Sequence, residues 1–260
     1  MAYQNILYDY VEKERIGSLT LNRPETRNAL SLELLEELCS CLTGVAKKRE
    51  AKAIIIKGAG VAFCAGHDLK EILGKELNDI RHLFHTCLNL MMLIQNIPQP
   101  VIAQVHGAAV AAGCQLVAAC DLVVAEQTAQ FATPGVKIGL FCATPMVALS
   151  RAVGRKKALE MLLTGKFISA REAMAHGLVN CVAAEGHLEE ETWRLAREIA
   201  QYSLVTLGLG KQAFYQQMGM AEGEAYHYAR EVISSNALMS DAVEGMSAFF
   251  EKRAPVWKER

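Results

Sequence analysis

Hydrophobic and polar positions along the chain predict alternating strands and helices in the first two thirds of the sequence. A helix is expected from Ser31, because apolar residues recur after it at three- and four-residue spacing: Leu34, Leu35, Leu38, Leu42 and Val45. The β-branched run at 53–56, closed by Gly58, is typical of a strand buried on both faces of a parallel sheet. The same reasoning predicts a helix at about 77–97, which Pro98 would end, and strands at 17–21, 101–105 and 122–125.

The pattern changes at Ser169, after which helices follow one another almost without strands. Ser169 and Glu172 have the spacing of a capping box, and Gly177 follows as a stop signal. Further helices are expected at 188–202, 204–218 and 224–250, with only 178–182 extended. We therefore divide the chain into a sheet-based core, 1–195, and a helical region, 196–260.

Composition narrows the classes of function. The 260 residues are 52% hydrophobic and 21% charged, which suits a globular protein with a large core. The formal net charge of −1 gives no general basic field for nucleic acid or for an anionic membrane. We expect neither nucleic acid nor a membrane as a partner.

Cysteine spacing and the N-terminal sequence bear on metal binding and on location. The 8 cysteines include no Cys-x-x-Cys pair, so we predict no metal site, and scattered thiols favour a reducing compartment. Residues 1–17 mix acidic and basic side chains with apolar ones, which fits neither a signal nor a transit peptide. We expect a cytoplasmic protein, and a mitochondrial one only if a presequence precedes the given residues.

Four motifs, in order, carry a resemblance to a known family. They are Asn22-Arg23-Pro24 with Arg27-Asn28-Ala29-Leu30, then Phe63 to Leu69, then Gly107 to Asp121, then Gln130-Phe131 onward. Together they resemble the enoyl-CoA hydratase/isomerase (crotonase) superfamily. Within it, the Ala-Ala-Gly-Cys-Gln and Ala-Thr-Pro-Gly patterns are similar to the branch typified by enoyl-CoA hydratase domain-containing protein 3.

The resemblance implies a fold and an assembly. The fold would be α/β: a crotonase-like ββα spiral with two roughly perpendicular sheets and a C-terminal helical trimerisation region. Residues 1–195 would carry the acyl-CoA site, and residues 196–260 would serve oligomerisation and contact with CoA. The Met and aromatic residues of the C-terminal region also favour a subunit contact, so a homo-oligomer, trimer or hexamer, is expected.

The resemblance also assigns binding residues. The backbone N–H groups of His67 and Ala112 would form an oxyanion hole for the thioester carbonyl of an acyl-CoA. We interpret the His67 side chain as a variable position, with proton transfer as the alternative. Coenzyme A would enter as part of the substrate, with no separate cofactor, and its expected contacts are Arg27, Ala29, Ala65, Asp68, Leu69, Phe249 and Lys252.

Ala112 stands where the family usually has glycine. The methyl group of Ala112 is tolerable if its φ is negative. If the oxyanion hole required a positive φ at this residue, the hole would be lost. A helix that starts at this residue would add its positive end to the field at the oxygen.

The two glutamates that hydratases of this family use correspond to Gln115 and Gly135. Gln115 can hold a water but cannot take its proton, and Gly135 can do neither. The resemblance therefore implies acyl-CoA binding and enolate stabilisation in fatty acid or acyl-CoA metabolism, with ordinary hydratase activity doubtful. The alternatives are a non-catalytic acyl-CoA binding protein, or a decarboxylase or hydrolase that uses another base.

Two further expectations concern residues near these positions. If the backbone frame is intact, restoring glutamate at both positions should raise hydration. Cys142 could act as a nucleophile if its thiol were activated, but no base is adjacent in sequence, so we interpret it as a small buried residue.

Overall fold

The computed structural model describes residues 3–259, so residues 1, 2 and 260 of the predicted ranges lie outside the described part. Its strands are β1 (Ile6–Val11), β2 (Ile16–Leu21), β3 (Ala53–Gly58), β4 (Val101–Val105), β5 (Ala108–Val110), β6 (Leu122–Glu126), β7 (Gln130–Ala132), β8 (Ile168–Ser169) and β9 (Cys181–Ala183). Its α-helices are α1 (Leu32–Lys48), α2 (Leu77–Asn96), α3 (Ala112–Ala119), α4 (Ala143–Ala152), α5 (Arg155–Thr164), α6 (Ala170–Ala175), α7 (Leu188–Ala200), α8 (Leu204–Gln217), α9 (Glu222–Ala237) and α10 (Ser240–Glu251). Short 3₁₀ turns lie at η1 (Pro24–Thr26), η2 (Leu69–Glu71) and η3 (Pro134–Ile138).

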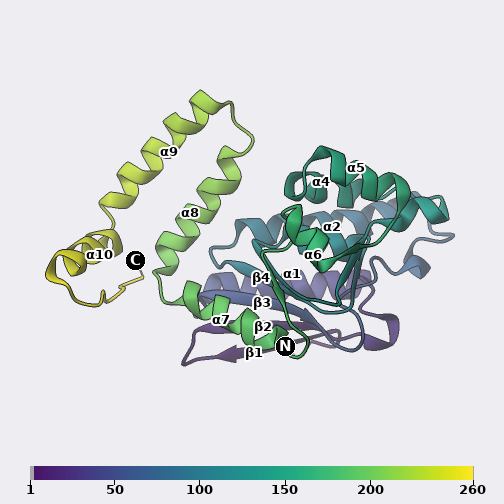
Figure 1. Cartoon of the computed structure of the whole chain (residues 1–260), viewed down its shortest axis with the longest axis horizontal. Coiled ribbons are helices and arrows are strands. Elements are labelled where there is room, and N and C mark those ends of the chain that lie inside the picture. The colour runs from purple at the N-terminus through teal and green to yellow at the C-terminus, as the bar shows by residue number, and fades with distance from the viewer. Residues whose placement is uncertain (1–2, 260) are drawn as a thin grey trace.

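A six-stranded sheet forms the centre of the molecule, in the order β1-β2-β3-β4-β6-β9 (Figure 1). The β1–β2 pair is antiparallel and the remaining neighbours are parallel. Successive residues of β3 enter two different cores: Ile54 and Ile56 pack with α1 and α2, whereas Ile55 packs with α7. The prediction that 53–56 is a strand buried on both faces is confirmed.

A second sheet of three short strands, β5-β7-β8, lies beside the first. β5 and β7 are parallel, while β7 and β8 are antiparallel. The two sheets and their covering helices agree with the expected α/β fold.

Most helix predictions hold, but one is wrong. Ser31 and Ser169 are N-caps as predicted, since their hydroxyl oxygens accept hydrogen bonds from the backbone of Leu34 and Glu172. The helix expected at 224–250 is in fact α9 and α10, separated by an extended Met239 with φ −71° and ψ 148°. The break has a tertiary cause, because Asp241 in the first turn of α10 is 1% exposed and bonds to the start of α8 and to the C-terminal tail.

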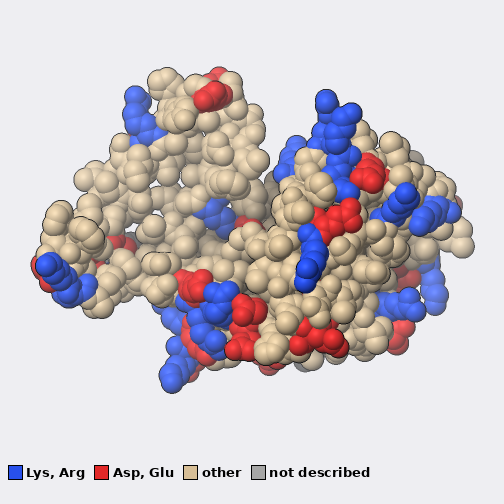
Figure 2. Space-filling model, in the orientation of Figure 1, with Lys and Arg blue, Asp and Glu red and all other residues tan. Residues whose placement is uncertain are grey.

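Helices α8, α9 and α10 form an arm that projects from the sheet-based body (Figure 1). The visible face of α8 and α9 carries few charges (Figure 2). Large apolar side chains are exposed along the arm: Phe214, Met218, Tyr226, Ile233, Leu238, Met246, Phe249 and Phe250. Among the described residues, no helix is both long and apolar enough to cross a membrane.

The base of the arm is fixed by a buried ion pair. Lys211 of α8 donates from Nζ to the carbonyl oxygens of Ile94 and Gln99 at 2.6 and 2.8 Å. The same ammonium lies 2.6 Å from Oδ2 of Asp121, which sits between α3 and β6. Because Ile94 is in the last turn of α2, a cation at this position also complements the helix dipole.

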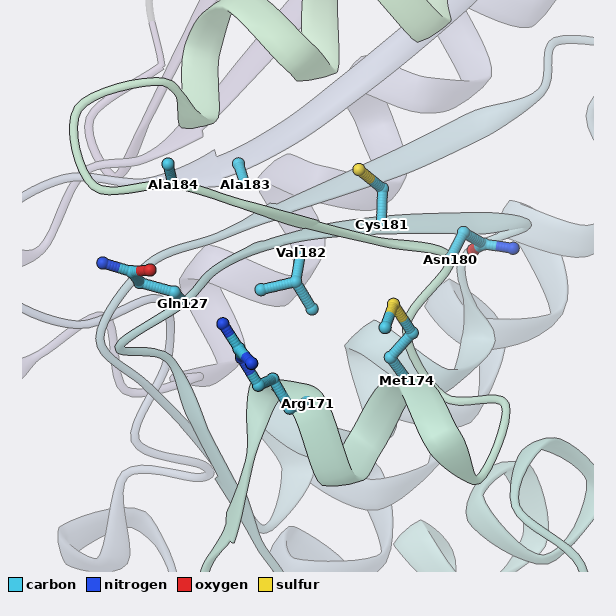
Figure 3. A pocket seen from close by; sticks show the side chains of 8 residues that line it. All are labelled: Gln127, Arg171, Met174, Asn180, Cys181, Val182, Ala183 and Ala184. Atoms are coloured by element: carbon cyan, nitrogen blue, oxygen red, sulfur yellow. The ribbon is translucent and has the colours of Figure 1, made fainter.

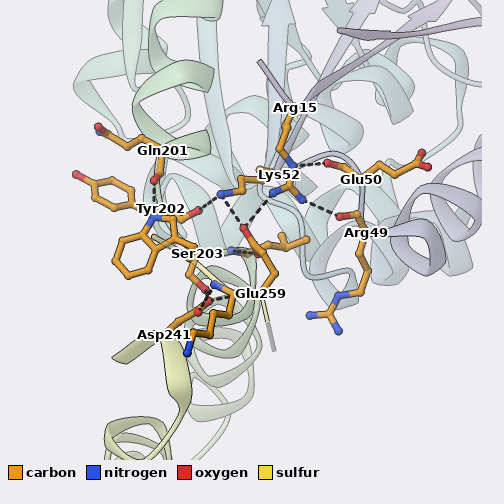
Figure 4. A network of polar contacts seen from close by, with 12 residues as sticks. Arg15, Arg49, Glu50, Lys52, Gln201, Tyr202, Ser203, Asp241 and Glu259 are labelled. Carbon is orange, nitrogen blue, oxygen red and sulfur yellow. Dashed lines mark hydrogen bonds and ion pairs between the residues drawn. The ribbon is translucent and has the colours of Figure 1, made fainter. Parts of the chain in front are cut away.

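The C-terminal tail forms a second attachment, drawn in Figure 4. The Glu259 carboxylate lies 2.7 Å from Lys52 Nζ and 3.1 Å from Arg15 Nη1, and it accepts a hydrogen bond from Leu204 N at 2.9 Å. Asp241 accepts the Ser203 hydroxyl at 2.5 Å, so the starts of α8 and α10 share this cluster. The tail therefore ties the arm to the β2–β3 side of the core.

The division at residue 195 stays a prediction. That residue lies inside α7, and Ala196 and Ala200 of the same helix belong to the core under the sheet. The helices that leave the body begin with α8 (Figure 1).

Candidate active site

Two of the motifs meet through backbone hydrogen bonds. Phe63 N and Cys64 N donate to the carbonyl oxygens of His106 and Ala108, each at 3.1 Å, and Val110 N donates back to Cys64 O at 2.9 Å. This parallel ladder brings the segment 63–67 alongside the segment that leads into α3.

The two segments approach so closely that Gly113 has no room for a side chain. A Cβ there would lie 2.3 Å from Cys64 O and 2.8 Å from Cys64 Cβ. Any larger residue would push the first turn of α3 away from Cys64. Gly113 therefore allows the first turn of α3, which begins at the candidate donor Ala112, to lie against the segment that leads to His67.

The N–H groups of His67 and Ala112 are both free of protein acceptors within residues 3–259. They lie on neighbouring backbone, since a Cβ at Gly66 would be 3.5 Å from the Ala112 nitrogen. Two unpaired donors side by side are what a developing negative charge on oxygen requires. The structure thus brings together the two residues that the resemblance assigned to the hole.

The strained backbone conformation is at Ala111, one residue before Ala112, where the sequence analysis considered a positive φ. Ala112 is the first helical residue, whereas Ala111 has φ 50° and ψ −115°, a conformation dominated by glycine in type II′ turns. This ψ differs from the α-helical value by roughly 70°, which rotates the peptide plane that carries the Ala112 N–H. The strain is held by two bonds, Ala111 N to Ala132 O at 2.8 Å and Gln115 N to Ala111 O at 3.0 Å.

The His67 side chain points away from bulk water. Its Nδ1 lies 3.4 Å from Leu30 O, and its ring meets Phe84 of α2 edge to face at 5.0 Å. Burial lowers the pKa of His67 below its usual value, which favours the neutral ring. Its Nε2 is buried without a partner, so neutral His67 with the proton on Nδ1 would present a lone pair.

Two further polar side chains near the site also lack partners. Gln115 on α3 is 5% exposed, and its Oε1 accepts no hydrogen bond. Thr133, which precedes η3, is fully buried, and its hydroxyl is likewise unpaired. We did not expect Thr133 from the sequence, because a threonine before Pro134 also fits an ordinary turn. Buried polar groups without partners are uncommon in native proteins. Ser18, Gln99 and Gln104 also have such an atom and are not among the predicted site residues, so the unpaired atoms of Gln115 and Thr133 support the site only together with the backbone donors.

Gly135, which the resemblance assigns to the second family glutamate, has no room for a side chain. A Cβ at Gly135 would lie 2.0 Å from Leu140 O and 2.9 Å from Cys142 Sγ. Leu140 N also donates to Gly135 O at 3.0 Å, so the turn 135–140 is folded tightly on itself. A glutamate at 135 would meet the loop that already occupies that volume, so the intact backbone frame on which the restored hydration depends is not available there.

Cys142 is a buried thiol at the start of α4. It is 8% exposed, and burial raises the pKa of its thiol, an effect that a hydrogen bond with the Gly135 backbone partly offsets. A thiol with a raised pKa is a poor nucleophile. The interpretation of Cys142 as a small buried residue agrees with this environment.

The expected CoA contacts fall into two groups. Arg27, Ala29, Ala65, Asp68 and Leu69 lie on the two loops that flank His67. Of these, Arg27, Ala65 and Leu69 are exposed, whereas Asp68 faces Arg23 at 3.5 Å and caps η2. Phe249 lies in α10 and Lys252 directly follows it. Helix α10 belongs to the arm and lies far from α4 (Figure 1).

The surface hollow in Figure 3 is separate from these residues. It lies between α6 and the edge strand β9, and Arg171 is its one charged lining residue. None of the predicted site residues lines it. Within the described part of the chain, no group of three or more His, Cys, Asp or Glu side chains could hold a metal.

Comparisons with known proteins show the family of the chain. The family model described as enoyl-CoA hydratase/isomerase matches residues 11–260. Enoyl-CoA hydratase domain-containing protein 3, mitochondrial, of Rattus norvegicus is 48% identical over 247 residues, which cover 95% of this chain and 82% of that protein. The Homo sapiens protein of the same name is 49% identical over 243 residues, covering 93% of this chain and 80% of that protein.

Solved structures give the same result. An enoyl-CoA hydratase from Mycobacterium smegmatis superimposes with a TM-score of 0.95 at 45% identity, covering 98% of this chain and 99% of that one. Human enoyl-CoA hydratase domain-containing protein 3 superimposes with a TM-score of 0.94 at 46% identity, covering 98% of this chain and 100% of that one.

The comparisons correct one expectation from the sequence. The rat, human and zebrafish relatives are all named as mitochondrial proteins. The expected cytoplasmic location is therefore wrong. The composition of residues 1–17 could not decide it, since targeting signals are commonly separate segments.

Replacing Ala111 with glycine tests the strain beside the hole. Ala111→Gly should raise the free energy of unfolding by about 1 kcal/mol, because relief of a strained φ/ψ outweighs the added freedom of the unfolded chain. Urea denaturation measures this. Ala112→Gly is the matched control: its φ is negative, so it should give no gain, and a gain for Ala112→Gly alone would contradict the assignment of strain to Ala111.

Proposed function

The chain belongs to the enoyl-CoA hydratase/isomerase family, and from this premise we propose that it binds an acyl-CoA thioester and stabilises its enolate. The observation that carries the proposal is the pair of unpaired N–H groups at His67 and Ala112 on adjoining backbone. Both would donate to the thioester oxygen, and the N-terminus of α3 would add its positive potential there. The substrate would belong to fatty acid or acyl-CoA metabolism.

The site favours reactions that need no carboxylate base. Gln115 replaces one acid, and the volume of the other is filled by Leu140 O and Cys142 Sγ. A thioester that forms its enolate by losing carbon dioxide needs no base. It needs only the oxyanion hole to stabilise the enolate and a solvent proton to complete the product. Decarboxylation is thus the second candidate, and binding without turnover is the third.

Acyl-CoA binding would draw on the loops around His67. The exposed Arg27 is available for a phosphate, and the Ala65 and Leu69 backbone lies beside the hole. Calorimetric titration with butyryl-CoA tests the proposal, and measurable heat is the expected result. Absence of binding to any acyl-CoA at millimolar concentration would sink it.

We also propose that a neighbouring subunit completes the site. The arm holds Phe249 and Lys252 away from the loops of their own chain, and its apolar face needs cover (Figures 1 and 2). A trimer, or a hexamer made of two trimers, would bring these residues to the CoA of an adjacent chain and would couple assembly to binding.

Hydration of crotonyl-CoA should be slow, at least ~10³-fold below an ordinary hydratase, because both proton-transfer groups are absent. Gln115→Glu restores one carboxylate in a similar shape and should raise the rate, whereas Gly135→Glu should fail to fold stably. The enoyl thioester absorbance follows the reaction. A native-like, active Gly135→Glu protein would contradict the closed loop that the structure shows.

Removing residues 245–260 should lower the oligomeric state and weaken acyl-CoA binding together. The truncation deletes Phe249 and Lys252 and also the Glu259 carboxylate that attaches the arm. Light scattering and calorimetry on both forms measure the two effects. A full-length monomer, or a truncated chain that binds with unchanged affinity, would rule out the shared site.

A further inference from the structure

Asn28 is a fully buried polar residue in a rare backbone conformation. It is 0% exposed and has a φ of 56°, in the left-handed region where asparagine is enriched over most residues. Arg27 before it also has a positive φ, 53°. These two residues turn the chain from η1 back toward the hole.

The Asn28 side chain joins two loops. Its Nδ2 lies 2.8 Å from Ala59 O, 2.9 Å from Ala62 O and 3.1 Å from Phe63 O. Its Oδ1 accepts a hydrogen bond from Arg23 N at 3.0 Å. The two N–H hydrogens of this amide are therefore shared among three carbonyl oxygens of the turn 59–63, while its oxygen is held by its own loop.

The same loop holds the backbone on both sides of His67. Leu30 N donates to Gly66 O at 2.7 Å, and Asp68 N donates to Leu30 O at 3.1 Å. Between these bonds the His67 N–H has no acceptor among the described residues, and the preceding Gly66 lies against the start of α3, where a Cβ would be 3.5 Å from Ala112 N. The position of the His67 donor thus depends on how the loop containing Asn28 sits against the segment 59–68.

The packing around Asn28 leaves little slack. A Cβ at Gly58 would lie 2.8 Å from Asn28 Nδ2 and 2.6 Å from Phe63 O. Phe63 in turn begins the ladder with His106. Loss of the Asn28 amide would therefore shift the backbone that leads to His67, because the neighbouring groups are closely packed against it.

We propose that Asn28 is a positioning residue for the oxyanion hole: its amide fixes the turn 59–63, and through it the direction of the His67 N–H. The inference rests on the proposed function, since it assigns a role within the same site. Asn28 touches no substrate, and it acts through the backbone that it holds.

The test compares two ligands on matched variants. Asn28→Gly keeps the positive φ without strain and removes only the amide. Arg49→Gly is the control, because Arg49 also has a positive φ, 55°, but caps α1 away from the site. Calorimetry gives the Kd of free CoA, which lacks the thioester carbonyl, and of butyryl-CoA, which carries it.

In Asn28→Gly the preference for butyryl-CoA over free CoA should fall about 5-fold or more, as expected for a displaced hydrogen-bond donor. The Kd of free CoA and both values for Arg49→Gly should change little. Should Asn28→Gly not fold, Asn28→Ser, which retains one hydroxyl donor, is titrated in the same way and should show a smaller fall.

The outcomes separate this inference from the proposed function. If the unaltered protein binds no acyl-CoA, the proposed function fails. If it binds and the Asn28 variants keep the wild-type preference, or lose affinity for both ligands equally, Asn28 only stabilises the fold and the positioning role is overturned.

Discussion

The contact between the first turn of α3 and Cys64 is the constraint on which the site depends. At Gly113 the two backbones are so close that a Cβ would lie 2.3 Å from Cys64 O. This approach brings the segment that leads to His67 against the start of α3, and the ladder to β5 holds the two segments together. The strained Ala111 belongs to the same arrangement, because its unusual ψ directs the Ala112 N–H. Enolate stabilisation would then come from main-chain groups alone, whatever side chains surround them.

Under the proposed function, with Gln115 and Gly135 at the family's glutamate positions, the site differs from that of a hydratase in charge as well as in proton transfer. Gln115 is neutral, and Gly135 is enclosed by its own loop. Two negative charges are thereby absent beside a partly positive helix end. Such a site would tolerate an anionic acyl group better than one with two carboxylates, since like charges repel. The unpaired Gln115 and Thr133 oxygens add polar contacts without adding charge.

The sequence was most informative where local rules decide the structure. Strands β3, β4 and β6 and helices α1 and α2 follow from apolar spacing, and the caps at Ser31 and Ser169 follow from residue type. Tertiary contacts decided the rest. The break before α10 depends on Asp241, whose partners are distant in sequence. Strand β1 was missed because its exposed face carries the apolar Leu7 and Val11, which hides from the sequence the alternation that its burial shows. The candidate donors His67 and Ala112 were proposed only through the family motifs, since a backbone N–H leaves no signal in the residue type. No spacing rule could show that the loop at Leu140 fills the volume beside Gly135.

The central claim is that two backbone N–H groups polarise a thioester carbonyl. Carbon-13 NMR of butyryl-CoA labelled at the thioester carbon tests it most directly, because two donors on the oxygen withdraw electron density from that carbon. The account predicts that the bound carbonyl resonance moves downfield from that of free butyryl-CoA, while a label at the terminal methyl carbon moves little. A bound ligand whose carbonyl resonance stays at the free position would contradict the account, since binding would then not involve the hole.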